Sequence, residues 1–286
     1  MSAAPVADDA NHRHFYPMFA AMSRNKLQKF AEMEAFPNVF QYPYAVLQAG
    51  GGCPLKGRWR EEAFGGEKRP IVLELGCGRG EYTVGLGALH PDKLFIGIDV
   101  KGARMWAGAR QANKAGMRNV AFLRTDIELL THFFAPGEVD EIWITFPDPQ
   151  MNKVNKRLTA TRFMKIYSQI LPPAGGVIHL KTDSPFLFTY TREMIRENSL
   201  PTEVCTADLY AAAVDPNLSE AQAIHTHYEQ QWIDRGLTIK YLRFRCLPRE
   251  AWAEPDVEIE RDTYRSYNRG QLSALDKRKG ENLIVG

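Results

Sequence analysis

The sequence predicts an α/β fold with a largely parallel sheet, and three observations lead to this prediction. Short apolar runs rich in β-branched residues alternate with helical segments after residue 70, as in βαβ units. The first run, 71–75, ends in a glycine-rich turn that opens a helix. Several runs lead into an aspartate, and the ends of parallel strands share one edge. A length of 286 residues suits one large domain with appendages, or at most two domains.

The expected elements follow from the apolar runs and from the residues that punctuate them. Strands are expected at 71–75, 94–98, 120–123, 141–145 and 177–181. Helices are expected at 81–89, 103–115, about 161–171 and from residue 185 onward. Gly116 ends the second helix as a C-cap glycine. Ser184 and Pro185 begin the last helix as its N-cap and first helical residue.

The segments outside this alternation divide the chain into three parts. Residues 1–26 are polar and are interpreted as a flexible arm. Residues 27–248 form the predicted domain, and its first part, 27–70, is an irregular lead-in. Residues 249–286 are polar, contain the run Asp-Lys-Arg-Lys-Gly, and are interpreted as a surface extension.

Composition restricts the class of protein. The net charge is +2 and the pI is about 8.3, so any basic surface must be local. The four cysteines are scattered without a C-x-x-C pair, which argues against zinc and disulfides and favours a reducing cytoplasm. We expect no metal site, no secretory signal and no membrane span. The sequence does not distinguish a monomer from a homodimer.

The glycine-rich turn indicates the cofactor. Gly76, Gly78 and Gly80 form G-x-G-x-G, so the third glycine comes one residue earlier than in the dinucleotide pattern. A dinucleotide needs helix N–H groups aimed at its pyrophosphate. S-adenosylmethionine has no phosphate and needs only a backbone that it can approach closely, which glycine provides. The spacing therefore favours S-adenosylmethionine over NAD.

Four carboxylates are placed to serve this cofactor. Asp99 can accept hydrogen bonds from the ribose hydroxyls, or it can cap the following helix. Glu74 lies in the first strand and could instead bond the glycine turn, and Asp126 could meet the adenine edge or act as an N-cap. In Phe146-Pro147-Asp148-Pro149 two prolines fix the backbone around Asp148. A purely structural turn is the alternative for this motif.

A basic window follows directly. Residues 151–165 hold five cationic side chains and no acidic one, which suits a phosphate backbone. Lys156 and Arg157 are the expected RNA contacts, whereas Arg162 and Lys165 could equally form a solvated helix face. Further along, 226–229 (Thr-His-Tyr-Glu) also matches a helix capping box.

At these residues the sequence resembles the tRNA (guanine-N7)-methyltransferases of the TrmB type, from about residue 27 to about residue 245. The most specific part is the Phe-Pro-Asp-Pro turn followed by Lys-Arg and then Thr-Asp. The family usually has a tryptophan where this chain has Gln150, and the loop before Lys156 is shorter here. The motifs that match are Leu-Glu-Leu-Gly-Cys-Gly-Arg-Gly at 73–80, Ile-Gly-Ile-Asp at 96–99, Phe-Pro-Asp-Pro at 146–149, Lys-Arg at 156–157, Thr-Asp at 182–183 and Thr-His-Tyr-Glu at 226–229.

The resemblance implies a Rossmann-like class I S-adenosylmethionine-dependent methyltransferase fold with a largely parallel seven-stranded sheet. It implies methyl transfer to guanine N7 at position 46 of the tRNA variable loop, with Asp148 at the reacting centre. The implied cofactor contacts are Glu74, Gly76, Gly78, Gly80, Asp99, Asp126 and Asp148. The implied contacts to RNA or its guanosine are Lys153, Asp183, Thr226, His227, Tyr228 and Glu229.

Three other functions remain open at this point. A methyltransferase for a protein or small molecule would share the same core, although the basic window argues against it. A non-catalytic tRNA-binding module would keep the fold, but the glycine turn and Asp148 argue against it. A nicotinamide dehydrogenase is the most distant alternative, because of the glycine spacing.

Overall fold

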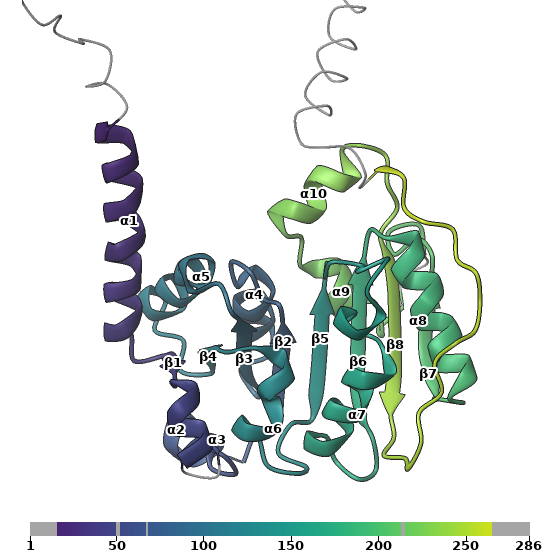
Figure 1. Ribbon diagram of the computed structural model, residues 1–286, viewed down its shortest axis with the longest axis horizontal. Coiled ribbons are helices and arrows are strands. Elements are labelled where there is room, and N and C mark those ends of the chain that lie inside the picture. Colours follow the sequence, from purple (N-terminus) through teal and green to yellow (C-terminus); the bar gives the residue numbers. More distant parts are fainter. Residues whose placement is uncertain (1–15, 50–51, 67, 213–214, 265–286) are drawn as a thin grey trace, which may run out of the picture.

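The computed structural model describes residues 16–49, 52–66, 68–212 and 215–264 (Figure 1). Its strands are β1 (Val39–Gln41), β2 (Ile71–Leu75), β3 (Leu94–Asp99), β4 (Val120–Arg124), β5 (Glu141–Thr145), β6 (Gly176–Thr182), β7 (Thr202–Thr206) and β8 (Lys240–Cys246). The α-helices are α1 (Tyr16–Ala35), α2 (Tyr44–Ala49), α3 (Trp59–Phe64), α4 (Glu81–Leu89), α5 (Gly102–Lys114), α6 (Leu130–Phe133), α7 (Thr161–Ile170), α8 (Pro185–Glu197), α9 (Ser219–Ala223) and α10 (His227–Ile233). Two short 3-10 helices cover Ile127–Leu129 and Val154–Lys156.

The eight strands that the structure describes form one sheet in the order β1-β4-β3-β2-β5-β6-β8-β7. Every neighbouring pair from β1 to β6 is parallel, whereas β8 runs antiparallel to both β6 and β7. The largely parallel α/β fold is therefore confirmed. The additional strand relative to the expected seven is β1, a short edge strand within the segment interpreted as an irregular lead-in.

Helices cover both faces of this sheet, and each face has its own apolar core. The whole of β2 is buried, and its side chains alternate between the two faces. Leu73 belongs to the core shared with α6, α7 and α8, whereas Val72 belongs to the core shared with α4, α5 and α10. A parallel strand buried on both sides needs a continuous apolar sequence, which explains why Ile71–Leu75 was recognisable.

Local sequence signals placed most elements of the central region correctly. The observed bounds of β2, α4 and β5 are those expected from the apolar runs. Ser184 caps α8 by accepting a hydrogen bond from the Leu187 N–H at 3.0 Å. Gly116 follows the last residues of α5 with φ +65°, the left-handed conformation of a C-cap glycine.

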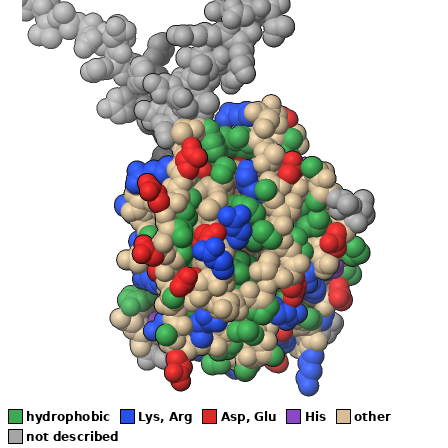
Figure 2. Space-filling view, turned by 90° about the vertical axis from the view of Figure 1, so that its right-hand side faces the viewer, with side chains coloured by type: hydrophobic (Ala, Val, Ile, Leu, Met, Phe, Trp, Pro, Cys, Tyr) green, Lys and Arg blue, Asp and Glu red, His purple; other side chains and the backbone are tan. Residues whose placement is uncertain are grey.

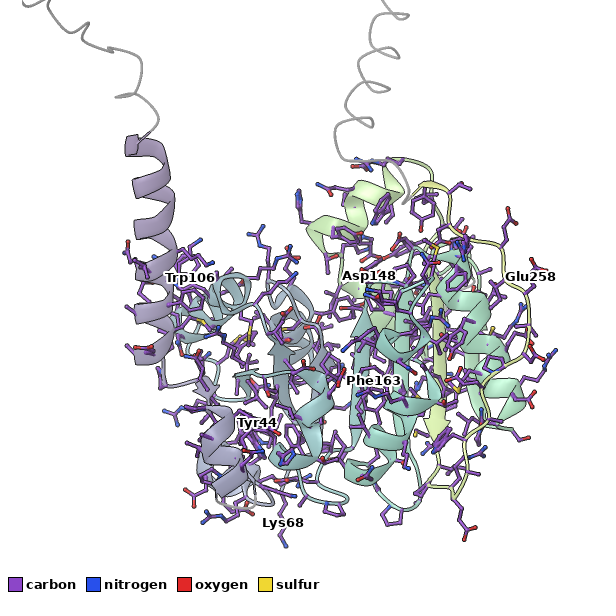
Figure 3. All side chains as sticks on the ribbon, viewed as in Figure 1. Tyr44, Lys68, Trp106, Asp148, Phe163 and Glu258 are labelled. Carbon is purple, nitrogen blue, oxygen red and sulfur yellow. The ribbon has the colours of Figure 1, made fainter. Side chains whose placement is uncertain are left out.

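The expected flexible arm, residues 1–26, overlaps the first part of a long helix. From Tyr16 onward it is the helix α1, which packs against α5 (Figure 1), while residues 1–15 lie outside the described residues. The contact centres on Trp106, labelled in Figure 3, whose indole donates to Glu32 at 2.7 Å and lies 4.7 Å from the Lys29 ammonium. Met33 of α1 is fully buried. This apolar anchor fixes the end of the helix nearest the sheet.

Residues 249–264 of the expected surface extension also pack on the domain. The side chains of Trp252 and Ile259 are partly buried against the core of α7 and α8, and Asp262 is only 4% exposed. Residues 265–286 lie outside the described part of the chain. Within the described residues, no helix combines the length and apolar character that crossing a bilayer requires.

Candidate active site

A cavity of about 590 Å³ opens at the carboxyl-terminal ends of β2 and β5. It brings the glycine-rich turn together with the Phe-Pro-Asp-Pro turn and with the start of α10. Figure 3 shows Asp148 at this end of the strands, close to α10. The residues opposite the glycine-rich turn are Thr145, Phe146, Asp148, Thr226, His227 and Tyr228.

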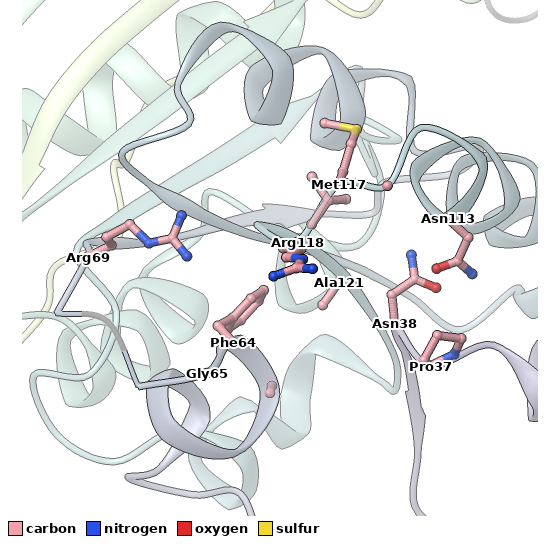
Figure 4. A pocket seen from close by; sticks show the side chains of 12 residues that line it. Pro37, Asn38, Phe64, Gly65, Arg69, Asn113, Met117, Arg118 and Ala121 are labelled. Carbon is pink, nitrogen blue, oxygen red and sulfur yellow. The ribbon is translucent and has the colours of Figure 1, made fainter.

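A second cavity, of about 520 Å³, lies at the opposite end of the strands (Figure 4). Phe64, Arg69 and Arg118 are among the side chains that line it. None of the residues predicted to carry chemistry reaches it. The cavity beside Asp148 is therefore the candidate active site.

The glycine-rich turn presents bare backbone to this cavity. Gly76, Gly78 and Gly80 all have positive φ, at 75°, 54° and 73°. A Cβ at Gly76 would meet no atom within 4 Å, so a ligand can approach its backbone directly. A Cβ at Gly80 would lie 2.5 Å from Phe122 Cε1, so Gly80 is required for packing. The open turn fits a cofactor that needs close approach and brings no phosphate.

Asp99 lies at the end of β3, beside this turn. One carboxylate oxygen accepts from the Gly78 N–H at 3.0 Å, and the other accepts from the Lys101 N–H at 2.8 Å. Asp99 thus fixes the glycine-rich turn and also caps the approach to α5. It is half-buried next to the cavity, so the placement is compatible with both roles that the sequence left open.

Glu74 connects three elements around the cavity. Its side chain is 4% exposed and accepts hydrogen bonds from the Thr83 N–H in α4 and the Thr145 hydroxyl in β5, both at 2.8 Å. The Thr83 hydroxyl bonds it as well. Burial raises the pKa of Glu74 to about 7, although these hydrogen bonds oppose the shift. Glu74 therefore braces the glycine-rich turn against β5 and contributes a carboxyl to the cavity wall.

The Phe-Pro-Asp-Pro turn holds Asp148 in an uncommon backbone geometry. Phe146 and Gln150, on either side, have positive φ of 48° and 46°, which is rare outside glycine. The Gln150 N–H donates to Asp148 Oδ1 at 3.0 Å. The Asp148 side chain is exposed and lines the cavity. Strained backbone of this kind persists where surrounding contacts enforce it.

Arg157, for which the sequence predicts a contact to an RNA phosphate, supplies those contacts. The residue is only 2% exposed, and its guanidinium donates to the carbonyls of Pro149 and Gln150, both at 3.1 Å. The guanidinium also lies 3.9 Å from the Tyr190 ring centroid and 4.9 Å from that of Phe186. Burial lowers the pKa of Arg157. In this arrangement Arg157 fastens the Asp148 turn to α8 and does not face the solvent.

The rest of the basic window is exposed but partly neutralised. Lys153 is exposed, and Lys156 forms an ion pair with Glu128 at 2.8 Å. Arg162 pairs with the same carboxylate at 2.6 Å. The hydrogen bond from Lys156 lowers the pKa of Glu128, with Arg162 contributing as well. The sequence window contained no acid, so only the fold reveals that Glu128 faces these cations.

Two predicted aspartates lie apart from the open cavity. Asp126 caps the short helix Ile127–Leu129 by accepting from the Glu128 N–H at 3.0 Å, the alternative that the sequence left open. Asp183 is fully buried at the end of β6 and accepts from the Tyr264 hydroxyl at 2.7 Å. Both follow strand ends as expected, but neither lines the cavity that holds Asp148.

The start of α10 forms the wall opposite the glycine-rich turn. Thr226 and Glu229 make a complete capping box, as their spacing allowed. His227 and Tyr228 are exposed and line the cavity, and the Tyr228 ring contacts Phe146 with centroids 5.9 Å apart. Glu229, in contrast, is fully buried. Thr226 and Glu229 thus shape the helix start, and Thr226, His227 and Tyr228 line the cavity.

Sequence reasoning missed the group that holds this wall in place, which is Lys181 of β6. Its ammonium is fully buried and pairs with Glu229 at 2.7 Å. It also donates to the Ala221 and Ile224 carbonyls at 2.7 and 3.0 Å, and to two tyrosine hydroxyls. Burial lowers the pKa of Lys181 to about 8, and Glu229 opposes the shift. In the sequence Lys181 is only a charge near a strand end, so no local signal identifies it.

The face of the molecule that carries α8 shows no surface field of a single sign. In Figure 2, Lys and Arg side chains are interspersed with Asp and Glu over this face. Among the described residues, no cluster of His, Cys, Asp and Glu could hold a metal ion. The candidate site is therefore a polar cavity with carboxyl groups on one wall and aromatic side chains on another.

Comparison with known proteins gives independent information about this chain. A family described as putative methyltransferase matches residues 68–242. The tRNA (guanine-N(7)-)-methyltransferase of Porphyromonas gingivalis is 62% identical over 243 residues, which cover 84% of this chain and 98% of the relative. The enzyme of the same name from Bacteroides thetaiotaomicron is 58% identical over 259 residues, 90% of this chain and 100% of the relative.

A solved structure supports the fold alone. The 16S rRNA methyltransferase KamB aligns with a TM-score of 0.50 at 15% identity, over 69% of this chain and 95% of that one. At this identity the match concerns the arrangement of the elements and says nothing about the residues that act.

Proposed function

This chain belongs to the tRNA (guanine-N7)-methyltransferase family, and from this premise we propose that it methylates N7 of the guanine at position 46 of tRNA. The enzyme uses S-adenosylmethionine as the methyl donor. One observation carries the assignment of the site: the glycine-rich turn and the Asp148 turn line the same cavity. Donor and acceptor can therefore meet there.

The residues around the cavity fit the donor. We propose that the open backbone of Gly76 and Gly78 lets S-adenosylmethionine approach, with Gly80 needed for packing beneath it. When bound, the donor supplies an electrophilic methyl group on a positively charged sulfur. The carboxylates proposed to face it are Glu74 and Asp148, which line the cavity, and Asp99, which bonds the glycine-rich turn. Asp126 follows β4 outside the lining of this cavity and is proposed to meet the adenine edge of the donor.

The acceptor needs positioning more than activation. Guanine N7 has an in-plane lone pair and no proton, so the chain does not have to provide a general base. Its residues hold the base in line, which removes much of the entropic barrier. Asp148 accepts hydrogen bonds from the base or stabilises the positive charge that the methylated guanine acquires. The exposed position of Asp148 in a rigid turn supports this role.

The proposed RNA contacts form two groups, one on the exposed surface and one lining the cavity. Lys153 and Lys156 reach solvent and suit phosphate groups, because flexible ammonium groups bind phosphate as point charges. His227 and Tyr228 line the cavity and suit an unstacked base, which aromatic side chains recognise by stacking.

Four further residues that the resemblance or the basic window assigned to the RNA are better described as supports. Each is buried, and each bonds another group of the protein itself. They are Arg157, Asp183, Thr226 and Glu229. Thr226 also contributes to the cavity wall.

The test is methyl transfer to defined transcripts. The enzyme is incubated with S-adenosylmethionine labelled in the methyl group and with unmodified tRNA, and the labelled nucleoside is then mapped. We expect 7-methylguanosine at position 46, and no label in a transcript that carries adenine there. Label at another guanine would contradict the assignment of position 46. Label on protein or on free nucleoside would contradict tRNA as the substrate. Asp148→Asn should reduce transfer in both rate and yield while leaving the binding of the donor measurable.

The cellular setting follows from the same premise. We propose a cytoplasmic enzyme, because tRNA is modified where it is synthesised and used. The free thiols of Cys53, Cys77, Cys205 and Cys246 agree with a reducing compartment.

A further inference from the structure

The carboxyl-terminal segment 247–264, here called the strap, runs along the outside of the domain from one end of the strands to the other. It leaves β8 at the end of the strands away from the active site and returns along α8 to the end where α10 lies (Figure 1). The role of this segment is not apparent from its polar sequence. Its contacts show that it is attached at defined points and ends beside the candidate active site.

The first attachment lies midway along the strap. The side-chain amide of Asn198 donates to the Ala253 carbonyl at 2.7 Å and accepts from the Ala253 N–H at 3.0 Å. The next residue, Glu254, accepts from the Thr161 N–H at 3.0 Å and from the Tyr190 hydroxyl at 2.5 Å. Glu254 therefore caps the start of α7, where an acidic group is favourable. These bonds fix the path of the strap over α7 and α8.

The second attachment lies at the active-site end of the strands. The carboxylate of Asp262, 4% exposed, accepts from the Phe186 N–H at 2.9 Å and bonds the Ser184 hydroxyl. Ser184 and Phe186 form the first turn of α8, directly after Asp183. The Asp262 backbone nitrogen lies 3.3 Å from the sulfur of Met151, which is three residues after Asp148. Asp262 thus joins the start of α8 to the loop that carries Asp148.

Tyr264, the last described residue of the strap, is connected to the cavity wall through Trp232. The hydroxyl of Tyr264 donates to Asp183 Oδ2 at 2.7 Å. Its ring meets Trp232 of α10 edge-on, with centroids 5.2 Å apart. Trp232 in turn contacts Tyr228, with centroids 5.5 Å apart, and Tyr228 lines the cavity. A continuous set of contacts therefore runs from the strap to the aromatic wall.

We propose that the strap is a positioning element for the RNA substrate, with Tyr264 as its decisive residue. The inference rests on the proposed function. Tyr264 holds Asp183 and the face of α10 that presents Tyr228, whereas the glycine-rich turn is held by the Asp99 carboxylate, which accepts from the Gly78 N–H. Loss of the Tyr264 hydroxyl should therefore weaken the binding of tRNA and leave the binding of the methyl donor unchanged.

The test compares three variants of the full-length chain. Tyr264→Phe removes only the hydroxyl, and Asp262→Asn weakens the attachment to α8. Glu258→Gln changes an exposed residue on the outer side of the strap (Figure 3) and is the matched control. For each, the dissociation constants for tRNA and for S-adenosylmethionine, kcat and KM, and the melting temperature are measured.

For Tyr264→Phe we expect a weaker affinity for tRNA, by at most about tenfold, the equivalent of one hydrogen bond to a charged group. The melting temperature should fall, because the buried Asp183 carboxylate loses a donor, whereas the affinity for S-adenosylmethionine should match that of the Glu258→Gln control. Asp262→Asn should shift tRNA affinity in the same direction. A merely structural role would lower stability and both affinities together.

Two outcomes would overturn the inference. Unchanged tRNA affinity in Tyr264→Phe would show that the hydroxyl does not position the substrate side. Tighter tRNA binding would show that the strap competes with the RNA for Asp183. Because binding is measured without turnover, either result stands even if the wild-type enzyme methylates another nucleotide, which would count against the proposed function instead.

Discussion

Replacing Arg157 by lysine tests whether this residue positions the Asp148 turn or contacts RNA. Lysine keeps the positive charge but loses the planar fork that spans the Pro149 and Gln150 carbonyls. A phosphate contact would tolerate the change, because an ammonium group also binds phosphate. If Arg157 instead holds the Asp148 turn in place, the substitution should impair the enzyme. The substitution therefore separates the two roles without removing the charge.

The magnitude follows from the two hydrogen bonds. Each bond from a charged donor contributes about 1.5–3 kcal/mol, and a lysine ammonium can replace at most one of them in this geometry. If the lost hydrogen bond contributes this energy to holding Asp148 in position in the transition state, its loss raises the barrier by the same amount and kcat falls by about ten- to a hundredfold. The contact with the Tyr190 ring, at 3.9 Å, is also weakened, which places the expected effect in the upper part of this range.

The assay is methyl transfer at saturating tRNA and S-adenosylmethionine, combined with tRNA binding at several salt concentrations. We expect a lower kcat with little change in tRNA affinity or in its salt dependence. Arg162→Lys, which changes an exposed arginine of the same window, should leave kcat unchanged. The reasoning is refuted if Arg157→Lys leaves kcat intact, or if it lowers tRNA affinity and its salt dependence instead.

Three further predictions concern other parts of the site. Lys156→Ala should weaken tRNA binding and reduce the slope of log affinity against log salt by about 0.7–0.9, as expected for one phosphate contact, and an unchanged slope would exclude that contact. The free energy of unfolding should fall as the pH rises from about 5 to about 7, because the folded state keeps the proton on Glu74 up to a pKa of about 7 while the unfolded state releases it near 4.5. Urea denaturation across this range measures the effect, and Glu74→Gln should flatten it. Gly80→Ala should abolish binding of S-adenosylmethionine and lower the melting temperature more than Gly65→Ala, since both have positive φ but only Gly80 has Phe122 atoms in the way. Equal effects of the two glycine substitutions on both measurements would count against the packing argument.

The central part of the fold could be predicted because its signals are local. A strand buried on both faces needs a near-continuous apolar run, which Ile71–Leu75 supplies apart from Glu74 and Glu141–Thr145 supplies in its three central residues. The glycine-rich turn and the two prolines around Asp148 constrain the backbone directly. These features predict that the glycine-rich turn and the Asp148 turn lie close together, and in the structure both line one cavity.

The missed features depend on partners that are distant in the sequence. β1 has only three residues, and its pairing with β4 is more than 80 residues away. Arg157 and Lys156 are adjacent and alike in the sequence, yet one is buried against α8 and the other is exposed. A charge pattern gives the density of cations but not the direction of each side chain. The role of Lys181 could not be predicted for the same reason, because its five partners come from three separate segments.

The position of β8 inside the sheet has a consequence for biosynthesis. β8 lies between β6 and β7, so β7 has no neighbour in the sheet until β8 has been synthesised. As the chain leaves the ribosome, the first six strands can assemble in order, while Thr202–Thr206 must wait as an unpaired edge. A nascent chain that stops before Lys240 leaves this strand open to pairing with another molecule. Completion of the sheet therefore requires the synthesis of Lys240–Cys246.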